Sequence, residues 1–309
     1  MVRSRRDPCG AVEAVVSGER DGTRTTRGTT SRGPSYHHVA ITGAAGAIGS
    51  ALARAMRRAW PECSLALIDR DPEPLGRLAR ELGSETSNEA SNGASQGQHH
   101  GAGGATVHVA DLRDLDALPA LVDTIEQAGP LEGLVNCAGV MKVQHVATWN
   151  WADARDLVTI DLLAPLRLQD LVVRGMCARG RGVIVNVASM AGRVPLRGAA
   201  YYGASKAGLA MASEIARADL APHNVRVVTV YPGPVKSALE AGARADYGGG
   251  GLLGRFVPTG DPDELARRIM VAIAADQPRV IYPRLYQAGW AATNLASWFA
   301  LSYGPPPVA

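Results

Sequence analysis

The fold of this chain is decided by the stretch His38-Val39-Ala40-Ile41-Thr42-Gly43-Ala44-Ala45-Gly46-Ala47-Ile48-Gly49. An apolar, strand-like run precedes its glycines, and the helix-like run Ser50–Met56 follows them. Glycines at such a turn let the backbone bend tightly and approach a pyrophosphate, which then sits on the helix N-terminus. An ordinary strand-to-helix turn is the alternative. The flanking strand and helix, with Asp69 downstream, favour a dinucleotide site.

From Tyr36 onward, apolar strand-like runs alternate with helical runs. This order indicates an α/β fold with a doubly wound parallel sheet of the Rossmann type in a single domain. Ligands of such a sheet bind at the carboxyl ends of its strands. The expected strands are His38–Ile41, Ser64–Ile68, Thr106–Val109, Gly133–Val135, Gly182–Val187, Val225–Val230 and Arg279–Tyr282, and the expected helices cover about 47–59, 72–82, 114–128, 150–178, 200–220 and 261–275.

A second motif, Tyr202-Gly203-Ala204-Ser205-Lys206, carries candidate chemistry. A tyrosine and a lysine four residues apart share one face of a helix. An ammonium beside a phenol favours the phenolate and so lowers the pKa of the phenol. Ser189 lies 13 residues before the tyrosine and could hold a carbonyl oxygen against it. A lone Tyr-x-x-x-Lys is a common helix pair, but with Ser189 and the glycine turn it predicts proton transfer to an alcohol or ketone.

Composition limits the class of protein. A chain of 309 residues that is 46% hydrophobic suits one α/β domain with appendages. Its four cysteines are scattered, which predicts reduced thiols in the cytoplasm. The net charge of +3 equals that of the first 35 residues, with seven arginines against four acids, so no nucleic-acid surface is expected. His99-His100 is the one hint of a metal, and we expect none to bind there.

Three segments stand apart from the domain expected over 36–284. Residues 1–35 lack apolar periodicity and predict a disordered basic tail, without the apolar region of a secretory signal. A targeting segment of another kind is the alternative. Residues 83–104 form a low-complexity insertion. Residues 285–309 carry no charge and hold five aromatic side chains, but polar residues interrupt them too often for a membrane span. We expect this extension to pack on the pocket or a second subunit, and contact of 285–303 with a membrane surface is the alternative.

Seven pieces, in one order, resemble the short-chain dehydrogenase/reductase family from about Tyr36 to about Tyr282. They are the Gly43 turn, Asp69, Asp111-Leu112, Asn136-Cys137-Ala138-Gly139, Ser189, Tyr202 with Lys206, and Pro232-Gly233-Pro234-Val235. The resemblance implies an NAD(P)-dependent oxidoreductase that interconverts a secondary alcohol and a ketone by hydride transfer.

Two other functions fit parts of the pattern. A nucleotide-sugar epimerase or dehydratase shares the spacing Gly43-x-x-Gly46-x-x-Gly49, but the 75 residues after Pro234 leave no room for its larger substrate domain. A non-catalytic sensor of NAD(P) often lacks the tyrosine or the lysine, and this chain keeps both.

The resemblance also implies catalytic roles. Tyr202 is the general acid or base, Lys206 lowers its pKa and holds the nicotinamide ribose, and Ser189 hydrogen-bonds the substrate oxygen. Asp161 stands where the family usually has an asparagine that holds a water in the proton relay to the lysine. An ionised aspartate lacks the donor, and it could pair directly with Lys206 and stiffen or misplace it. We expect activity, and we expect Asp161→Asn to raise turnover.

Cofactor choice depends by resemblance on Asp69, whose carboxylate would accept the ribose hydroxyls of NAD(H) and repel the 2′-phosphate of NADP(H). NAD(H) is therefore favoured, although Arg70 follows and could attract a phosphate. Asp111 would bind the adenine amino group, and Ala47 stands where the usual second glycine would be. The implied cofactor-binding residues are Thr42, Gly43, Gly46, Ala47, Ile48, Gly49, Asp69, Arg70, Asp111, Leu112, Asn136, Ala138, Gly139, Tyr202, Lys206, Pro232, Gly233, Val235 and Ser237.

The substrate and the assembly are less defined by the sequence. Residues 237–256 are expected to form a substrate loop, with Gly248–Gly251 as its hinge. Arg193 and its neighbours flank Ser189 and are candidates for the pocket wall, with a solvated loop as the alternative. Relatives commonly pair through the helices expected at 150–178 and 200–220, which implies a homodimer or homotetramer. The substrate is a small alcohol or ketone of unspecified identity.

Overall fold

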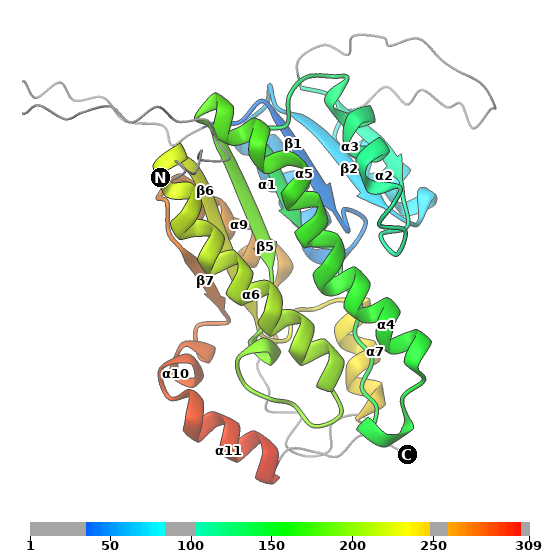
Figure 1. The fold of residues 1–309 in the computed structure, drawn as a ribbon, viewed down its shortest axis with the longest axis vertical. Helices are drawn as coiled ribbons and strands as arrows, with labels where there is room; N and C mark the ends of the chain where they lie inside the picture. Colours follow the sequence, from blue (N-terminus) through cyan, green and yellow to red (C-terminus); the bar gives the residue numbers. More distant parts are fainter. Residues whose placement is uncertain (1–34, 84–102, 248–258, 304–309) are drawn as a thin grey trace, which may run out of the picture.

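The computed structural model describes residues 35–83, 103–247 and 259–303. Within them, seven strands form one parallel sheet in the order β3-β2-β1-β4-β5-β6-β7 (Figure 1). The order reverses between β1 and β4, where doubly wound sheets open their ligand crevice. The predicted fold class is confirmed. The strands are β1 (His38–Thr42), β2 (Ser64–Asp69), β3 (Ala105–Val109), β4 (Gly133–Asn136), β5 (Gly182–Val187), β6 (Val225–Pro232) and β7 (Arg279–Tyr282).

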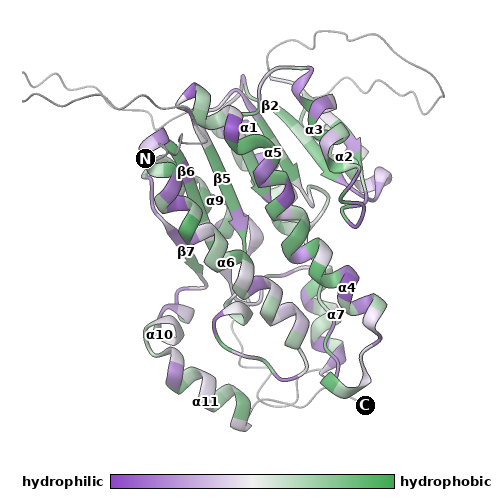
Figure 2. Cartoon of the chain, viewed as in Figure 1, coloured by the Kyte–Doolittle hydropathy of each residue, from purple (hydrophilic) through white to green (hydrophobic). Residues whose placement is uncertain are grey.

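Helices cover both faces of this sheet. The buried side chains of α9 (Pro262–Ala274) recur at Leu265, Ile269 and Ile273, so one face of the helix is turned to the core. Central strands such as β1 and β5 are buried along their whole length because helices cover both of their sides, and Figure 2 shows them mainly hydrophobic. One face carries α1 (Ala47–Ala59), α2 (Pro72–Glu81) and α9 (Pro262–Ala274), and the other carries α3 (Leu118–Glu126), α5 (Ala164–Arg179) and α6 (Ala200–Leu220).

The helix expected over 150–178 is not continuous, which corrects that prediction. It consists of α4 (Trp151–Val158), the π-helical turn η2 (Thr159–Leu163) and α5. The Ala164 N–H donates to the Thr159 carbonyl five residues earlier, and Pro165 has no N–H for the ordinary bond to the Asp161 carbonyl. The wide turn places Asp161 in the interior, beside Gly139 at the end of β4.

The remaining segments lie mostly beyond the carboxyl ends of the strands. The start of the expected substrate loop is helical: the Ser237 hydroxyl accepts the Glu240 N–H and caps α7 (Ala238–Asp246). Its Gly248–Gly251 hinge lies outside the described residues, as do residues 1–34, most of the insertion (84–102) and 304–309. The other elements are η1 (Val146–Thr148), α7 (Ala238–Asp246), η3 (Met190–Gly192), η4 (Ala221–His223), α10 (Tyr286–Ala291) and α11 (Thr293–Tyr303).

The C-terminal helices behave differently from each other. In α10, Trp290 packs edge-to-face on Tyr231 with ring centroids 4.5 Å apart, and the Arg193 guanidinium lies 4.3 Å from its ring. In α11, Trp298 and Phe299 are more than half exposed, and the helix projects from the body of the molecule (Figure 1). Among the described helices, none has the length and apolar character needed to cross a membrane.

Candidate active site

The glycine turn lies at the reversal point of the sheet. Gly43 has φ +64°, and a Cβ built there would lie 2.6 Å from the Ala138 Cα, so both conformation and space require glycine. At Gly49 a Cβ would lie 2.1 Å from the Gly43 carbonyl oxygen. No side chain caps the N-terminus of α1, and its first turn holds no acid. Its N–H groups therefore remain available to an anion such as a pyrophosphate.

Thr42 and Asn136 hold the strand ends at this point together. The Thr42 hydroxyl accepts the N–H groups of Cys137 (3.1 Å) and Ala138 (3.2 Å). The Asn136 amide donates to the Asn186 Oδ1 (2.8 Å) and to a backbone carbonyl in α5. Both side chains are almost fully buried and hold the end of β4 beside the ends of β1 and β5. Their expected contacts with the cofactor would have to come from the backbone.

Asn186 is a site-building residue that the sequence reasoning missed. It receives the Asn136 bond and donates to the Ser213 hydroxyl (2.8 Å), which donates in turn to the Leu209 carbonyl (2.6 Å). This chain of bonds ties β4 and β5 to α6, the helix that carries the tyrosine and the lysine. The available signal was one amide within the otherwise apolar run Gly182–Val187, because buried polar groups need partners.

Asp69 lies beside the glycine turn. Its carboxylate accepts the N–H of Ala45 (3.0 Å) and the N–H of Arg70 (2.8 Å), and its side chain stays partly exposed. These bonds fix an acceptor next to the N-terminus of α1, where the ribose of a bound dinucleotide would lie. Arg70 is exposed and lines a hollow of about 230 Å³ together with Val140, which follows the end of β4.

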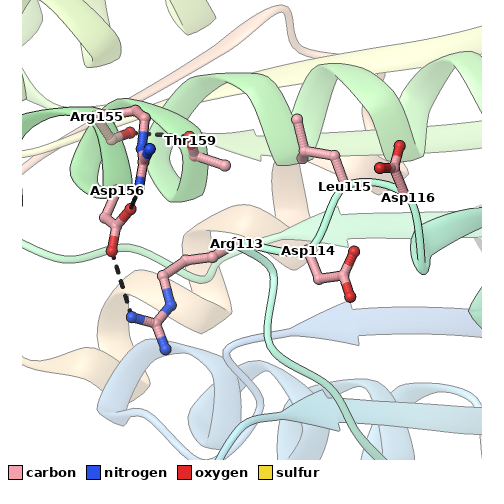
Figure 3. A pocket seen from close by; sticks show the side chains of 7 residues that line it. All are labelled: Arg113, Asp114, Leu115, Asp116, Arg155, Asp156 and Thr159. Carbon is pink, nitrogen blue, oxygen red and sulfur yellow. Dashed lines mark hydrogen bonds and ion pairs between the residues drawn. The ribbon is translucent and has the colours of Figure 1, made fainter. Parts of the chain in front are cut away.

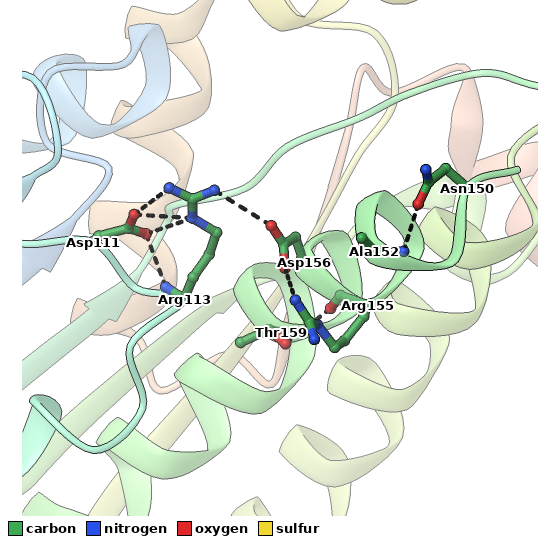
Figure 4. A network of polar contacts seen from close by, with 7 residues as sticks. All are labelled: Asp111, Arg113, Asn150, Ala152, Arg155, Asp156 and Thr159. Carbon is green, nitrogen blue, oxygen red and sulfur yellow. Dashed lines mark hydrogen bonds and ion pairs between the residues drawn. The ribbon is translucent and has the colours of Figure 1, made fainter.

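Asp111 is engaged by a neighbour that the sequence reasoning did not consider. Figure 4 shows Arg113 between Asp111, which follows β3, and Asp156 of α4. The guanidinium Nε lies 2.9 Å from the Asp111 Oδ2, and Nη1 lies 3.3 Å from the Asp156 Oδ2. The Arg113 bonds hold the pKa of Asp111 below its usual value. An adenine amino group would therefore share this carboxylate with Arg113, while Leu112 is buried.

A wide hollow of about 530 Å³ opens over this ion-pair network (Figure 3). Its walls carry charges of both signs that partly pair with each other. It contains none of the residues expected to act on the substrate. The lining residues are Arg113, Asp114, Leu115, Asp116, Arg155, Asp156 and Thr159.

The three predicted catalytic side chains come together at the carboxyl end of β5. Ser189 follows that strand, and its Oγ accepts the Ala191 N–H (3.1 Å). Tyr202 and Lys206 lie on α6, and both are buried. The Lys206 Nζ lies 5.9 Å from the centre of the Tyr202 ring and donates to the Val187 carbonyl (3.2 Å).

The environment of Tyr202 moves its pKa in two directions. Burial raises the pKa of the phenol and Asp161 raises it further, while the Lys206 ammonium and a bond with the Ser189 side chain lower it. The net direction is upward. The sequence expectation of a lowered pKa is therefore corrected: Lys206 acts as predicted, but burial outweighs it.

Asp161 is fully buried against Lys206. Its Oδ1 accepts the Val140 N–H (2.8 Å), and its Oδ2, which has no hydrogen-bond partner, lies 3.8 Å from the Lys206 Nζ. Burial raises the pKa of the carboxyl to about 6. A Cβ at Gly139 would lie 3.2 Å from both the Asp161 Oδ1 and the Lys206 Nζ, so a small residue keeps the pair together. The direct pairing considered from the sequence is therefore present.

The segment after β6 forms another wall of the site. Val235 is buried and bridges to Gly260, and the Ser237 hydroxyl is used to cap α7. A Cβ at Gly233 would lie 2.7 Å from the Tyr286 ring of α10. Helix α10 thus packs against the end of β6. There the Pro232 carbonyl oxygen lies 3.5 Å from the Ser189 Oγ.

This fold and site define a dinucleotide-dependent oxidoreductase of the Rossmann type. The chain matches the model of the short chain dehydrogenase family over residues 37–248, and it belongs to that family. It is 31% identical to the D-threitol dehydrogenase of Mycolicibacterium smegmatis, over 78% of this chain and 86% of that relative. It is 30% identical to the ketoacyl reductase HetN of Nostoc sp., over 64% of this chain and 63% of that relative.

Solved structures agree with the family. A metagenomic short-chain oxidoreductase in complex with NADP is 30% identical, with a TM-score of 0.61, over 79% of this chain and 96% of that one. A short-chain dehydrogenase from Sphingobium yanoikuyae in complex with NADPH is 26% identical, with a TM-score of 0.65, over 86% of this chain and 96% of that one. The predicted class is confirmed: the chain is an NAD(P)-dependent oxidoreductase acting on CH–OH groups and their ketones. The epimerase and sensor alternatives find no support.

Proposed function

We propose that Tyr202 is the general acid in ketone reduction and the general base in alcohol oxidation. The observation that supports this most is the burial of Ser189, Tyr202 and Lys206 together at the carboxyl end of β5. Ser189 would donate to the substrate oxygen, and Tyr202 would exchange a proton with the same oxygen. Lys206 would favour the phenolate and hold ribose hydroxyls. The nicotinamide, when bound, supplies or accepts the hydride.

We further propose that NAD(H) is preferred. The N-terminus of α1 can receive the pyrophosphate, and the absence of a side chain at Gly43 lets the backbone come close to it. Asp69 supports the preference because a carboxylate held beside the turn would repel a 2′-phosphate. Two observations oppose this choice: Arg70 is exposed next to Asp69 and could attract a phosphate, and two similar solved structures hold NADP or NADPH.

The assembly is proposed to be a homodimer or homotetramer through α4–α5 and α6. Both regions expose large apolar side chains: Trp151 is 70% exposed on α4, and Met211 and Ile215 lie exposed four residues apart on α6. A cytoplasmic location is supported by Cys63 and Cys137, which are free thiols.

The test is binding of NADH and NADPH by fluorescence, followed by turnover of a panel of secondary alcohols and ketones. The panel includes threitol and galactitol, because similar proteins are named for them. We expect Tyr202→Phe to bind NADH normally and to lose about 10²–10⁴-fold in kcat. A wild-type protein that binds neither nucleotide, or a Tyr202→Phe variant with unchanged turnover, refutes the proposal.

A further inference from the structure

Asp161 is a buried ionisable group that the proposed mechanism does not use. It is 0% exposed, and its Oδ2 lacks a hydrogen-bond partner. The widened turn η2 carries it inward, and the Val140 N–H fixes its other oxygen. A carboxylate is stable there only if a positive charge is near, and the Lys206 Nζ is 3.8 Å away. The carboxylate is therefore built into the site rather than left on its surface.

The charged and titratable groups around this pair come from several elements. Tyr202 acts on the pair from α6, the helix that also carries Lys206, and the charge of Lys206 acts on the Cys137 thiol just after the end of β4. Asp69 acts on Cys137 from the end of β2. Among the groups whose charges act on the Tyr202 phenol, Lys206 lowers the pKa of the phenol and Asp161 raises it. The aspartate thus opposes the lysine at the same phenolic oxygen.

We propose that Asp161 is a positioning residue that offsets the charge of Lys206, so that Tyr202 keeps its proton and the enzyme is poised for ketone reduction. This inference rests on the proposed function. An ionised carboxylate next to an ammonium leaves little net charge to stabilise a phenolate. A protonated phenol is the form that donates a proton to a ketone oxygen, whereas alcohol oxidation requires the phenolate.

The proposal predicts a pH profile. Replacing Asp161 by asparagine keeps the Val140 bond, since the amide oxygen can accept it, and removes one negative charge. Tyr202 should then ionise at lower pH, by about one unit, as expected for removal of a nearby like charge. At a pH on the rising limb of the pH profile for alcohol oxidation, kcat/KM of Asp161→Asn should be about tenfold higher than that of wild type. Ketone reduction near neutral pH should change little, because the phenol is protonated in both proteins, so the higher turnover expected from the sequence should appear in alcohol oxidation alone.

The matched control is Thr159→Val. Thr159 lies in the same widened turn and is nearly buried, and its hydroxyl donates to the Arg155 carbonyl (2.8 Å), but it carries no charge. We expect Thr159→Val to leave the oxidation limb where it is. The inference is wrong if Asp161→Asn leaves the limb unmoved or moves it upward, or if Thr159→Val moves it equally. Asp161→Ala removes the same charge and must shift the limb in the same direction as Asp161→Asn.

A second measurement needs no turnover. The ultraviolet absorbance of tyrosinate is titrated in wild type and Asp161→Asn, each with and without Tyr202→Phe, so that the difference within each pair gives the ionisation of Tyr202. We expect a lower pKa for Tyr202 in the Asp161→Asn background. Equal pKa values would overturn the inference even if Tyr202→Phe had already confirmed the proposed function. A lower value in a protein that oxidises no alcohol would uphold the electrostatic claim and refute the proposed function alone.

Discussion

A comparison of Gly43→Ala with Gly180→Ala separates two costs in stability. One is the crowding of two strand ends, and the other is backbone strain. Both glycines have a left-handed backbone conformation, with φ +64° and φ +61°. The strain of an alanine at either position therefore costs about 1–2 kcal/mol of stability. At Gly180 a Cβ meets nothing within 4 Å. At Gly43 it would lie 2.6 Å from the Ala138 Cα, and overpacking of this kind adds about 1–3 kcal/mol. Gly43→Ala should therefore cost about 2–5 kcal/mol and Gly180→Ala about 1–2.

The assay is urea unfolding followed by circular dichroism, with NADH affinity measured on the folded proteins. We expect Gly43→Ala to weaken NADH binding, because the added methyl group pushes the end of β4 away from the glycine turn. Gly180 lies at the C-terminus of α5, at the opposite end of the sheet, so Gly180→Ala should bind NADH normally. Equal losses of stability in the two variants, or normal NADH binding by Gly43→Ala, would show that this contact does not shape the crevice.

Three further predictions concern single side chains. Asp69→Asn should raise the affinity for NADPH relative to NADH, measured by fluorescence, because it removes the charge that repels a 2′-phosphate; an unchanged ratio contradicts the preference for NAD. The pKa of Asp161 is raised from 3.8 to about 6 on folding. Its favourable contribution to the free energy of unfolding is therefore present below about pH 4 and is lost as the pH rises through 6. The melting temperature of wild type relative to Asp161→Asn should therefore fall between pH 4 and 7, and a flat difference contradicts the raised pKa. Asn186→Ala leaves the Asn136 amide without its main partner and should cost about 1–3 kcal/mol in urea unfolding, whereas a loss near zero would mean that water replaces the bond.

Local patterns in the sequence predicted most of the fold. The strands expected from apolar runs match the observed ones within two residues at each end, because the helices bury both faces of the sheet and leave those runs uninterrupted. The grouping of Ser189, Tyr202 and Lys206 could likewise be predicted, since a helical spacing and a strand end fix their relative positions. These features depend on residues close in sequence or on the regular geometry of a parallel sheet.

Other features depend on contacts that no local pattern encodes. The turn at Thr159–Leu163 was missed because apolar spacing continues through it, and Pro165 is also acceptable in the first turn of an ordinary helix. The direction of the Tyr202 pKa depends on how deeply the phenol is buried, which becomes known only when α6 is packed. The bridge from Arg113 to Asp156 joins residues 43 positions apart.

The contact of α10 with the end of β6 has a consequence for how such a protein diversifies. Tyr286 and Trp290 reach Gly233 and Arg193 from a part of the chain that contributes no strand to the sheet. Substitutions in this helix can alter the neighbourhood of the reacting groups while the central scaffold stays intact. We therefore expect new substrate preferences to arise in α10 sooner than in the parallel strands, whose ends hold the glycine turn and Ser189 in place.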